Sequence, residues 1–264
     1  MAGISADQAL GIDIGGTGIK GGLVDLTKGE LIGERFRLDT PQPATPDAVA
    51  ETVGKVAQSF SFDGACGVDF PGVVLNGVVQ TAANMDKAWI GTSLADTVGP
   101  KLAGPGFYLN DADAAGLAEA RYGAGRGHRG LVVTVTFGTG IGIALIHDGK
   151  LVPNAELGHI EIDGHDAEHK AAASARERDG LSWEHWAKRA SKYLVTLENL
   201  IWPELIILGG GISKKPDKWV PLLKTRTPLA VAQLINNAGI VGSALAANEA
   251  ALDRRVTPAG PSPH

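Results

Sequence analysis

The sequence predicts an α/β protein made of two related domains, and three observations lead to that prediction. The 264 residues suffice for two moderate domains. The 36 glycines are about twice the share of an average protein, and they gather in loops beside apolar runs. The tetrapeptide Gly-Thr-Gly-Ile occurs at residues 16–19 and again at residues 138–141, each time between two strand-like runs. This repeat indicates an internal duplication.

Composition and charge restrict the class of protein. The hydrophobic content of 44% and the charged content of 20% are typical of a soluble globular protein. The net charge of −5 provides no positive field for nucleic acid or an anionic membrane. The single cysteine, Cys66, excludes an internal disulfide and a cysteine-rich zinc site. No leader-like or membrane-spanning run is present, so we expect a cytoplasmic protein. We expect its Pro-rich tail, residues 255–264, to be disordered.

The first glycine-rich stretch, "DIGGTGIKGGLVD" at residues 13–25, matches the spacing of a dinucleotide-binding fingerprint. That fingerprint needs a strand before the glycines and a helix after them. The apolar run 9–14 provides the strand, but "IKGGLVDL" follows, and Gly21–Gly22 with Leu23–Val24 favours another strand. The stretch therefore predicts a strand–turn–strand unit and no Rossmann fold.

The second stretch, "VTVTFGTGIGIALIHDGKLV" at residues 133–152, has the same arrangement. A tight hairpin turn would explain either stretch alone. Two such turns with the same threonine favour phosphate binding, because each turn presents backbone N–H groups and a hydroxyl. We expect the two turns to face each other across a cleft and to hold a phosphate chain.

A candidate catalytic base lies between the two turns. Residues 107–109 predict a short strand and residues 112–122 an Ala-rich helix, so Asn110 and Asp111 fall at the carboxyl end of a strand. Asp111 could accept the proton of an attacking alcohol, as a catalytic Asp does in kinases. The alternative is that Asn110 or Asp111 only caps the helix, and the spacing alone leaves both open.

The segment "NAELGHIEIDGHDAEH" at residues 154–169 is rich in carboxylates and imidazoles. Its three histidines suggest a metal site, but their spacing matches no zinc-finger pattern. The segment fits better as a polyol site, in which these groups exchange hydrogen bonds with sugar hydroxyls.

A third glycine cluster follows an apolar strand in "ELIILGGGISKKPDKW" at residues 204–219. The lysines after it, Lys214, Lys215 and Lys218, fit either a solvated surface helix or a track for a polyanion.

Taken in order, "DIGGTGIKGGLVD", "FPGVV", "AANMDKAW", "NDADAAGLAE", "TFGTGIGIAL", "ELGH" and "LGGGIS" resemble the ROK sugar kinases. "ELGHIEIDGHDAE", "ARERDGLSW", "PELIILGGGISKKPDKW" and "NNAGIVGSAL" resemble the polyphosphate glucokinase and polyphosphate/ATP glucomannokinase branch of that family. The resemblance implies a two-lobed, actin-like ATPase fold, related to hexokinase and ribonuclease H, with a central cleft. We expect a small lobe over residues 1–111 completed by a helix at about 241–254, and a large lobe over residues 112–240.

The same resemblance implies a role for each matching position. Asp111 is the expected catalytic base. The expected sugar ligands are Asn84, Asn110, Asp111, Glu156, His159 and Glu168. The expected phosphate and nucleotide contacts are Asp13, Gly15, Gly16, Thr17, Lys20, Thr136, Gly138, Thr139, Gly140, Gly209, Gly210 and Gly211. Lys214, Lys215 and Lys218 are the candidate polyphosphate track.

The implied reaction moves a phosphoryl group from inorganic polyphosphate or ATP to the 6-hydroxyl of glucose, with mannose as a second candidate sugar. Mg²⁺ is expected with the donor. No structural zinc is expected, because "DGHDAEHKAAAS" lacks the cysteines that many ROK members carry there, and His159 is then expected to serve the sugar alone. We expect a monomer or homodimer without nucleic-acid or membrane partners. The alternatives are an ATP-only ROK hexokinase and a non-catalytic sugar-sensing ROK protein.

Overall fold

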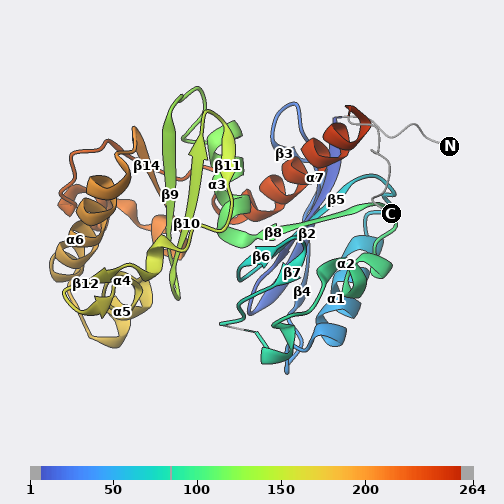
Figure 1. Cartoon of the computed structure of the whole chain (residues 1–264), viewed down its shortest axis with the longest axis horizontal. Coiled ribbons are helices and arrows are strands. Elements are labelled where there is room, and N and C mark those ends of the chain that lie inside the picture. Colours follow the sequence, from blue (N-terminus) through green and yellow to red (C-terminus); the bar gives the residue numbers. More distant parts are fainter. Residues whose placement is uncertain (1–6, 84, 257–264) are drawn as a thin grey trace, which may run out of the picture. The chain divides into compact units, whose positions relative to one another are not determined.

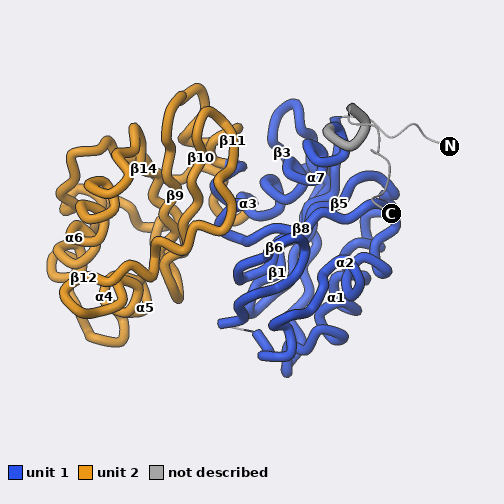
Figure 2. The backbone as a smooth tube through the Cα atoms, viewed as in Figure 1, with its two compact units in different colours: residues 1–118, 237–264 blue, residues 119–236 orange. Residues whose placement is uncertain are grey.

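The computed structural model describes residues 7–83 and 85–256, and the chain divides into two compact units (Figure 2). Unit 1 comprises Met1–Ala118 and Asn237–His264, and unit 2 comprises Glu119–Asn236. The first boundary falls inside helix α3 (Asp111–Tyr122), somewhat later than the strand end at which the sequence predicts it. Asn84 and residues 257–264 of the expected tail lie outside the described residues. None of the helices in the described part has the length and apolar character that a membrane crossing requires.

The first glycine-rich stretch forms the strand–turn–strand unit that the sequence predicts. Strands β1 (Gln8–Ile14) and β2 (Gly18–Asp25) are antiparallel. Strand β5 (Cys66–Phe70) lies parallel to β1, and β8 (Gly106–Asn110) lies parallel to β5. With β3 (Glu30–Leu31) the order is β3-β2-β1-β5-β8, and β4 (Phe36–Asp39) pairs with β2. The parallel strands β1, β5 and β8 therefore bring their carboxyl ends to one edge of the sheet.

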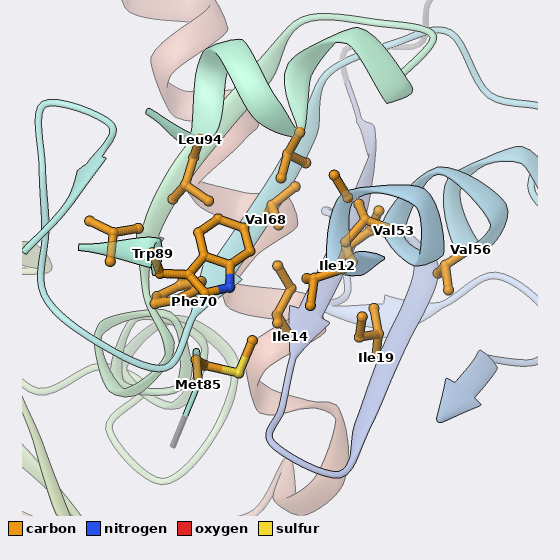
Figure 3. Close-up of a cluster of buried hydrophobic side chains, with 14 of the residues drawn as sticks. Ile12, Ile14, Ile19, Val53, Val56, Val68, Phe70, Met85, Trp89 and Leu94 are labelled. Atoms are coloured by element: carbon orange, nitrogen blue, oxygen red, sulfur yellow. The ribbon is translucent and has the colours of Figure 1, made fainter. Parts of the chain in front are cut away.

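Alternate residues of β1 and β5 point to opposite faces of this sheet. On one face, Ile12, Ile14 and Phe70 join an apolar cluster with helix α1 (Pro46–Gln58) (Figure 3). Trp89, in the 3₁₀ turn η1 (Lys87–Trp89), packs on Phe70 with ring centroids 4.8 Å apart. This face is a conventional core, and it anchors the strands whose ends carry the polar residues.

Helix α7 (Ala238–Val256), drawn in red in Figure 1, lies on the other face of the sheet. It approaches so closely that only glycine fits beneath it. A Cβ on Gly11 would lie 1.8 Å from the Ile240 carbonyl oxygen, and one on Gly67 would lie 1.8 Å from that of Ser243. The C-terminal helix thus belongs to unit 1, and it begins a few residues before the predicted start.

Unit 2 repeats the strand order of unit 1. Strands β9 (Leu131–Phe137), β10 (Ile141–His147) and β11 (Lys150–Val152) are antiparallel neighbours. Strands β14 (Leu205–Gly209) and β15 (Leu229–Val231) continue the sheet in parallel, in the order β11-β10-β9-β14-β15. In both sheets the first two strand pairs of the order are antiparallel and the last two are parallel. This topology supports the duplication inferred from the repeated tetrapeptide.

An aromatic cluster forms the core of unit 2 around Phe137, the last residue of β9. Trp186 and Tyr193 come from helix α6 (Trp183–Ile201), and the ring of Trp186 meets that of Phe137 edge-on at 5.4 Å. Trp219 meets Phe137 edge-on at 6.0 Å. Because Phe137 directly precedes Gly138, this packing fixes the point at which the second turn begins.

The remaining elements are short. In unit 1 they are β6 (Val74–Leu75), β7 (Val78–Val79), α2 (Leu94–Thr97) and the 3₁₀ turn η2 (Gly99–Lys101). In unit 2 they are η3 (Leu157–His159), β12 (Glu161–Ile162), β13 (His165–Asp166), α4 (Ala167–Ala171), α5 (Ala173–Arg178), η4 (Gly211–Lys214), η5 (Pro216–Lys218) and η6 (Val220–Leu222). The 3₁₀ turn η7 (Ile235–Asn237) precedes α7. Lys214 and Lys218 therefore lie in 3₁₀ turns, with Lys215 between the two turns, and the run forms no surface α-helix.

Candidate functional site

The first turn, between β1 and β2, is held through its carbonyl groups. The Gly15 N–H donates to the Gly18 carbonyl at 3.0 Å. The Thr40 hydroxyl donates to the Gly15 carbonyl at 2.6 Å, and the Arg37 guanidinium donates to the Thr17 carbonyl at 3.0 Å. Bonds from outside the turn thus fix its backbone before any ligand binds.

An ion pair lies at the base of this turn. The Lys20 ammonium donates to Asp13 Oδ2 at 2.7 Å, and the two residues are direct partners across the β1–β2 ladder. Both side chains are mostly buried, with 25% and 17% of their surface exposed. The pair holds the Lys20 charge close to the first Gly-Thr-Gly turn.

Asp69, on β5, is a further acidic residue beside Asp13 that the sequence analysis did not identify. It is the direct partner of Asp13 in the β1–β5 ladder and is fully buried. Its Oδ2 accepts a hydrogen bond from the Ser243 hydroxyl of α7 at 2.9 Å. Burial, and next the negative charges of Asp13 and Asp111, raise the pKa of Asp69 well above its usual range. The available signal was the repeat of "GID" (11–13) as "GVD" (67–69).

The structure shows which residue caps the start of α3. Asn110 Oδ1 accepts the Asp113 N–H at 3.0 Å, so Asn110 is the helix cap. Its amide also donates to the Gly72 carbonyl at 3.0 Å. Asp111 is exposed at the first position of the helix, where the macrodipole favours a negative charge. Asp111 Oδ1 accepts the N–H of the adjacent Ala112 at 2.8 Å, whereas the capping bond to the third residue of the helix is made by Asn110.

The second turn, between β9 and β10, is braced in the same way as the first. The Gly138 N–H donates to the Gly140 carbonyl at 2.9 Å. Ser174, on α5, donates its N–H to the Gly138 carbonyl at 3.1 Å and its hydroxyl to the Thr139 carbonyl at 2.6 Å. Thr136 precedes the turn, and its hydroxyl lies 3.4 Å from the Gly142 carbonyl. Each unit thus offers a rigid Gly-Thr-Gly turn at the edge of its sheet.

Glu168, an expected sugar ligand, touches this second turn. Its Oε2 accepts the Ile141 N–H at 2.7 Å. A Cβ on Gly140 would lie 2.3 Å from the same oxygen, so this contact requires glycine at position 140. The contact couples a candidate sugar-binding carboxylate to the candidate phosphate turn.

His159 is held by two carboxylates of its own segment. Its Nδ1 lies 2.9 Å from Asp166 Oδ2, and its Nε2 lies 3.8 Å from Glu156 Oε2. The hydrogen bond to Asp166 raises the pKa of His159 above its ordinary value. Burial opposes ionisation of Asp166, but the bond to His159, the His159 charge and the backbone N–H groups of Glu168 and His169 together outweigh it and lower the pKa of the Asp166 carboxyl. The pair fixes the orientation of the imidazole ring, which is half exposed.

Asp166→Asn should lower the pKa of His159, because the neutral amide no longer favours the imidazolium. As the pH is raised, His159 should then lose its proton at a lower pH than it does in the wild type. An NMR titration of the His159 ring protons measures this directly. Asp163→Asn is the control, because Asp163 lies in the same segment but bonds Lys192. Equal titration of His159 in the wild type and Asp166→Asn would contradict the assignment.

The third glycine cluster lies beside the second turn. Gly209 pairs with Thr136 in the β9–β14 ladder. Gly210 has a φ of +85°, and a Cβ on it would lie 2.3 Å from the Phe137 carbonyl oxygen. Glycine is required here for both reasons. The lysines that follow, Lys214, Lys215 and Lys218, are exposed.

The predicted residues thus gather in two sets, one in each unit. Unit 1 holds Asp13, Gly15, Gly16, Thr17, Lys20, Asn110 and Asp111 at the carboxyl-end edge of its parallel strands. Unit 2 holds Thr136, Gly138, Thr139, Gly140, Glu168, Gly209, Gly210 and Gly211 around the second turn, and in the same unit Glu156 and Asp166 each pair with His159. Within residues 7–83 and 85–256, no three His, Cys, Asp or Glu side chains are grouped to hold a metal ion. Burial raises the pKa of the Cys66 thiol to about 12, so this cysteine is no nucleophile.

Comparisons with known proteins show which family the chain resembles. The model of the ROK family matches residues 9–175. The chain is 58% identical to a polyphosphate glucokinase of Mycobacterium tuberculosis over 240 residues, which are 90% of this chain and 91% of that protein. It is 55% identical to a polyphosphate glucokinase of Mycobacterium leprae over 92% of this chain and 75% of that protein.

Solved structures resemble the whole fold. The crystal structure of the inorganic polyphosphate/ATP-glucomannokinase from Arthrobacter sp. strain KM matches with a TM-score of 0.87 and 56% identity, covering 93% of this chain and 99% of that one. A ROK family glucokinase from Streptomyces griseus, solved with glucose and AMPPNP, matches with a TM-score of 0.79 and 26% identity, covering 92% and 99%.

Proposed function

This chain belongs to the ROK family, and we propose that it is a glucokinase that uses inorganic polyphosphate or ATP as phosphoryl donor. The observation that carries the proposal is the 58% identity to a polyphosphate glucokinase over 90% of the chain. The fold is the actin-like ATPase fold of ROK sugar kinases. Glucose is the acceptor, and mannose is the second acceptor to be tested, because a glucomannokinase is among the similar structures.

The reaction needs a base at the sugar 6-hydroxyl, and we assign that role to Asp111. The Asp111 carboxylate takes the hydroxyl proton as the oxygen forms its bond to the terminal phosphorus. The bond from that phosphorus to the bridging oxygen breaks, and its electron pair stays on the shortened donor. The exposed position of Asp111 and the capping role of Asn110 support this assignment.

The two Gly-Thr-Gly turns are the proposed phosphate contacts, with Lys20 as a fixed positive charge at the base of the first turn. A braced turn cannot reorganise when charge develops on the phosphoryl oxygens, which is the condition for electrostatic stabilisation of a transition state. The carbonyl bonds from Thr40, Arg37 and Ser174 provide that bracing. The Gly209–Gly211 loop beside the second turn is the proposed adenosine contact when ATP is the donor.

Mg²⁺ is assigned to the donor and not to a protein site. The described residues do not fit a site with protein ligands alone, since they contain no group of three candidate ligands. A donor-bound Mg²⁺ would neutralise phosphate charge. The roles assigned to Asp111, Lys20 and the turns require no protein-held metal.

A steady-state comparison tests the function. The purified protein should form hexose 6-phosphate from glucose with both polyphosphate and ATP, measured by a coupled dehydrogenase assay. Activity with ATP alone would identify an ATP-only ROK hexokinase instead. Donor hydrolysis without hexose phosphate, or sugar binding without either reaction, would identify a non-catalytic member. Parallel assays with mannose determine the sugar range.

Glu168→Gln should raise the Michaelis constant for the sugar and leave the donor constants nearly unchanged. The amide oxygen can still accept the Ile141 N–H, so the second turn keeps its brace. The variant loses only the negative charge of the group that would accept hydrogen bonds from sugar hydroxyls. A hydrogen bond to a charged acceptor is roughly twice as strong as one to a neutral acceptor. The Michaelis constants for glucose, ATP and polyphosphate, measured in turn, show whether the change is confined to the sugar. A change confined to the donor constants would assign Glu168 to the phosphate turn.

Replacing Lys214, Lys215 and Lys218 together by alanine should weaken long polyphosphate more than short oligophosphate, and ATP least. A polyphosphate chain extends past its reacting end and can reach exposed lysines that ATP does not reach. Each exposed contact contributes roughly 0.2–1 kcal/mol, so several lysines and a long chain are needed. The salt dependence of the polyphosphate Michaelis constant should also flatten. Equal weakening of ATP and long polyphosphate would assign the lysines to the nucleotide loop or to the fold.

A further inference from the structure

Three carboxylates of unit 1 lie close together, and the proposed function assigns a role only to that of Asp111. Asp13 and Asp69 are partners in the β1–β5 ladder, and Asp111 follows β8, the next strand of the sheet. Asp13 Oδ2 and Asp69 Oδ2 also lie beside the same residue of α7, Gly239. A Cβ on Gly239 would lie 3.0 Å from each of these oxygens. Like charges so close cannot all persist in a buried environment.

The surroundings of each carboxylate show which one remains uncharged. Asp13 is bonded to the Lys20 ammonium, and Asp111 is exposed to water. Asp69 is fully buried, and it accepts its hydrogen bond from a neutral hydroxyl, that of Ser243. The Lys20 ammonium and the N-terminus of α7 both stabilise one negative charge beside Asp13 and Asp69. Asp13 carries that charge, because it is the carboxylate bonded to Lys20.

The two oxygens of Asp69 also differ. Oδ2 accepts the Ser243 hydroxyl, whereas Oδ1 has no hydrogen-bond partner among the described residues. An ionised carboxylate with a bare, fully buried oxygen carries a large desolvation cost. A proton on Oδ1 removes that charge and leaves Oδ2 as the acceptor that Ser243 needs.

We propose that Asp69 is a positioning residue that keeps its proton in the folded protein and so preserves Asp13 and Asp111 as the two charged carboxylates of unit 1. Ionised Asp69 would add a negative charge behind the phosphate turn and would repel the donor. It would also favour the protonated form of Asp111, which cannot act as a base. The charged groups that face Asp69 are Asp13 from β1, Lys20 from β2 and Asp111 from α3. The role in phosphoryl transfer rests on the proposed function, whereas the protonation state does not.

The pH dependence of stability tests the protonation state without any assay of activity. An acid whose pKa is higher in the folded than in the unfolded chain stabilises the fold fully below its ordinary pKa of about 3.9. That stability is lost as the pH rises toward the folded-state pKa. Asp69→Asn has no proton to lose. Its melting temperature relative to wild type should therefore rise by about 3–5 °C per pH unit as the pH increases above about 5, until the folded-state pKa of Asp69 is reached.

The matched control is Asp63→Asn, an exposed aspartate in the segment before β5. Its melting temperature should keep a constant offset from wild type over the same pH range. Infrared spectra at neutral pH should contain the carbonyl stretch of an un-ionised carboxyl group in wild type and lack it in Asp69→Asn. A constant offset for Asp69→Asn, or the absence of that band from wild type, would overturn the proposal.

The functional part is tested by two further measurements. Asp69→Ala removes the acceptor of Ser243 and should lower turnover at least tenfold, whereas Asp69→Asn should restore most of it at neutral pH. As the pH rises, the polyphosphate Michaelis constant should increase in wild type but stay flat in Asp69→Asn. If the wild type transfers phosphate but Asp69→Asn is as impaired as Asp69→Ala, the positioning role is wrong. If the wild type transfers no phosphate to sugar, the proposed function fails, and the melting and infrared results still decide the protonation state.

Discussion

Asp111→Asn is expected to lower turnover about 10²–10⁴-fold, the usual effect of removing a general base. The amide cannot accept the proton of the sugar hydroxyl but can still exchange hydrogen bonds with it. The dissociation constant for glucose should therefore change little. Asn110 remains the cap of α3, so the helix should keep its start and the variant its fold. Turnover in the coupled assay and calorimetric titration with glucose measure the two effects separately.

Asp47→Asn is the matched control for this variant. Asp47 is also an exposed aspartate in the first turn of a helix of unit 1. Its loss should cost a few tenths of a kcal/mol in stability through the helix dipole and should leave turnover intact. If Asp111→Asn retains more than about a tenth of wild-type turnover, the base lies elsewhere.

Lys20→Met should lower turnover about 10²–10³-fold, the usual loss when one preorganised electrostatic donor is removed. Methionine preserves the apolar stem but removes the charge beside the first proposed phosphate turn. It also leaves the Asp13 carboxylate without its 2.7 Å partner, and that unpaired charge repels the donor. The Michaelis constants for polyphosphate and ATP should rise together, while glucose binding should change less.

Lys28→Met provides the comparison, because Lys28 is an exposed lysine whose nearest carboxylate, that of Asp25, lies 3.8 Å away. Its kinetics should match wild type. A Lys20→Met enzyme with normal turnover would exclude Lys20 from the transition state. In that case the Lys20–Asp13 pair would serve the fold alone.

Local patterns in the sequence were enough to predict the hairpins. The strand-favouring residues after each Gly-Thr-Gly turn are neighbours in the chain, and β1–β2 and β9–β10 form as expected. The same reasoning could not choose between Asn110 and Asp111 as helix cap, since both residue types cap well. That choice depends on where each side chain points, and only the coordinates contain this information.

Contacts between distant residues were beyond sequence reasoning. Asp69 lies in the run "ACGVDF", which resembles an ordinary buried strand, and its importance appears only when the register places it beside Asp13. The bond from Ile141 to Glu168 joins residues that no helix or strand period connects. Asn84, a predicted sugar ligand, lies outside the described residues, so its role stays a prediction.

Unit 1 begins first on the ribosome but is completed last. Its sheet is built from residues that precede Ala118, yet α7, which covers Gly11 and Gly67, is synthesised only after all of unit 2. Unit 2 is continuous in the chain and can fold as soon as it emerges, since domains fold as units during synthesis. Until α7 arrives, the face of β1 and β5 that carries Asp13 and Asp69 stays open to water. A chain cut short before residue 238 would thus hold a complete second unit beside a first unit whose carboxylates are hydrated, charged and unable to form the arrangement described for the finished protein.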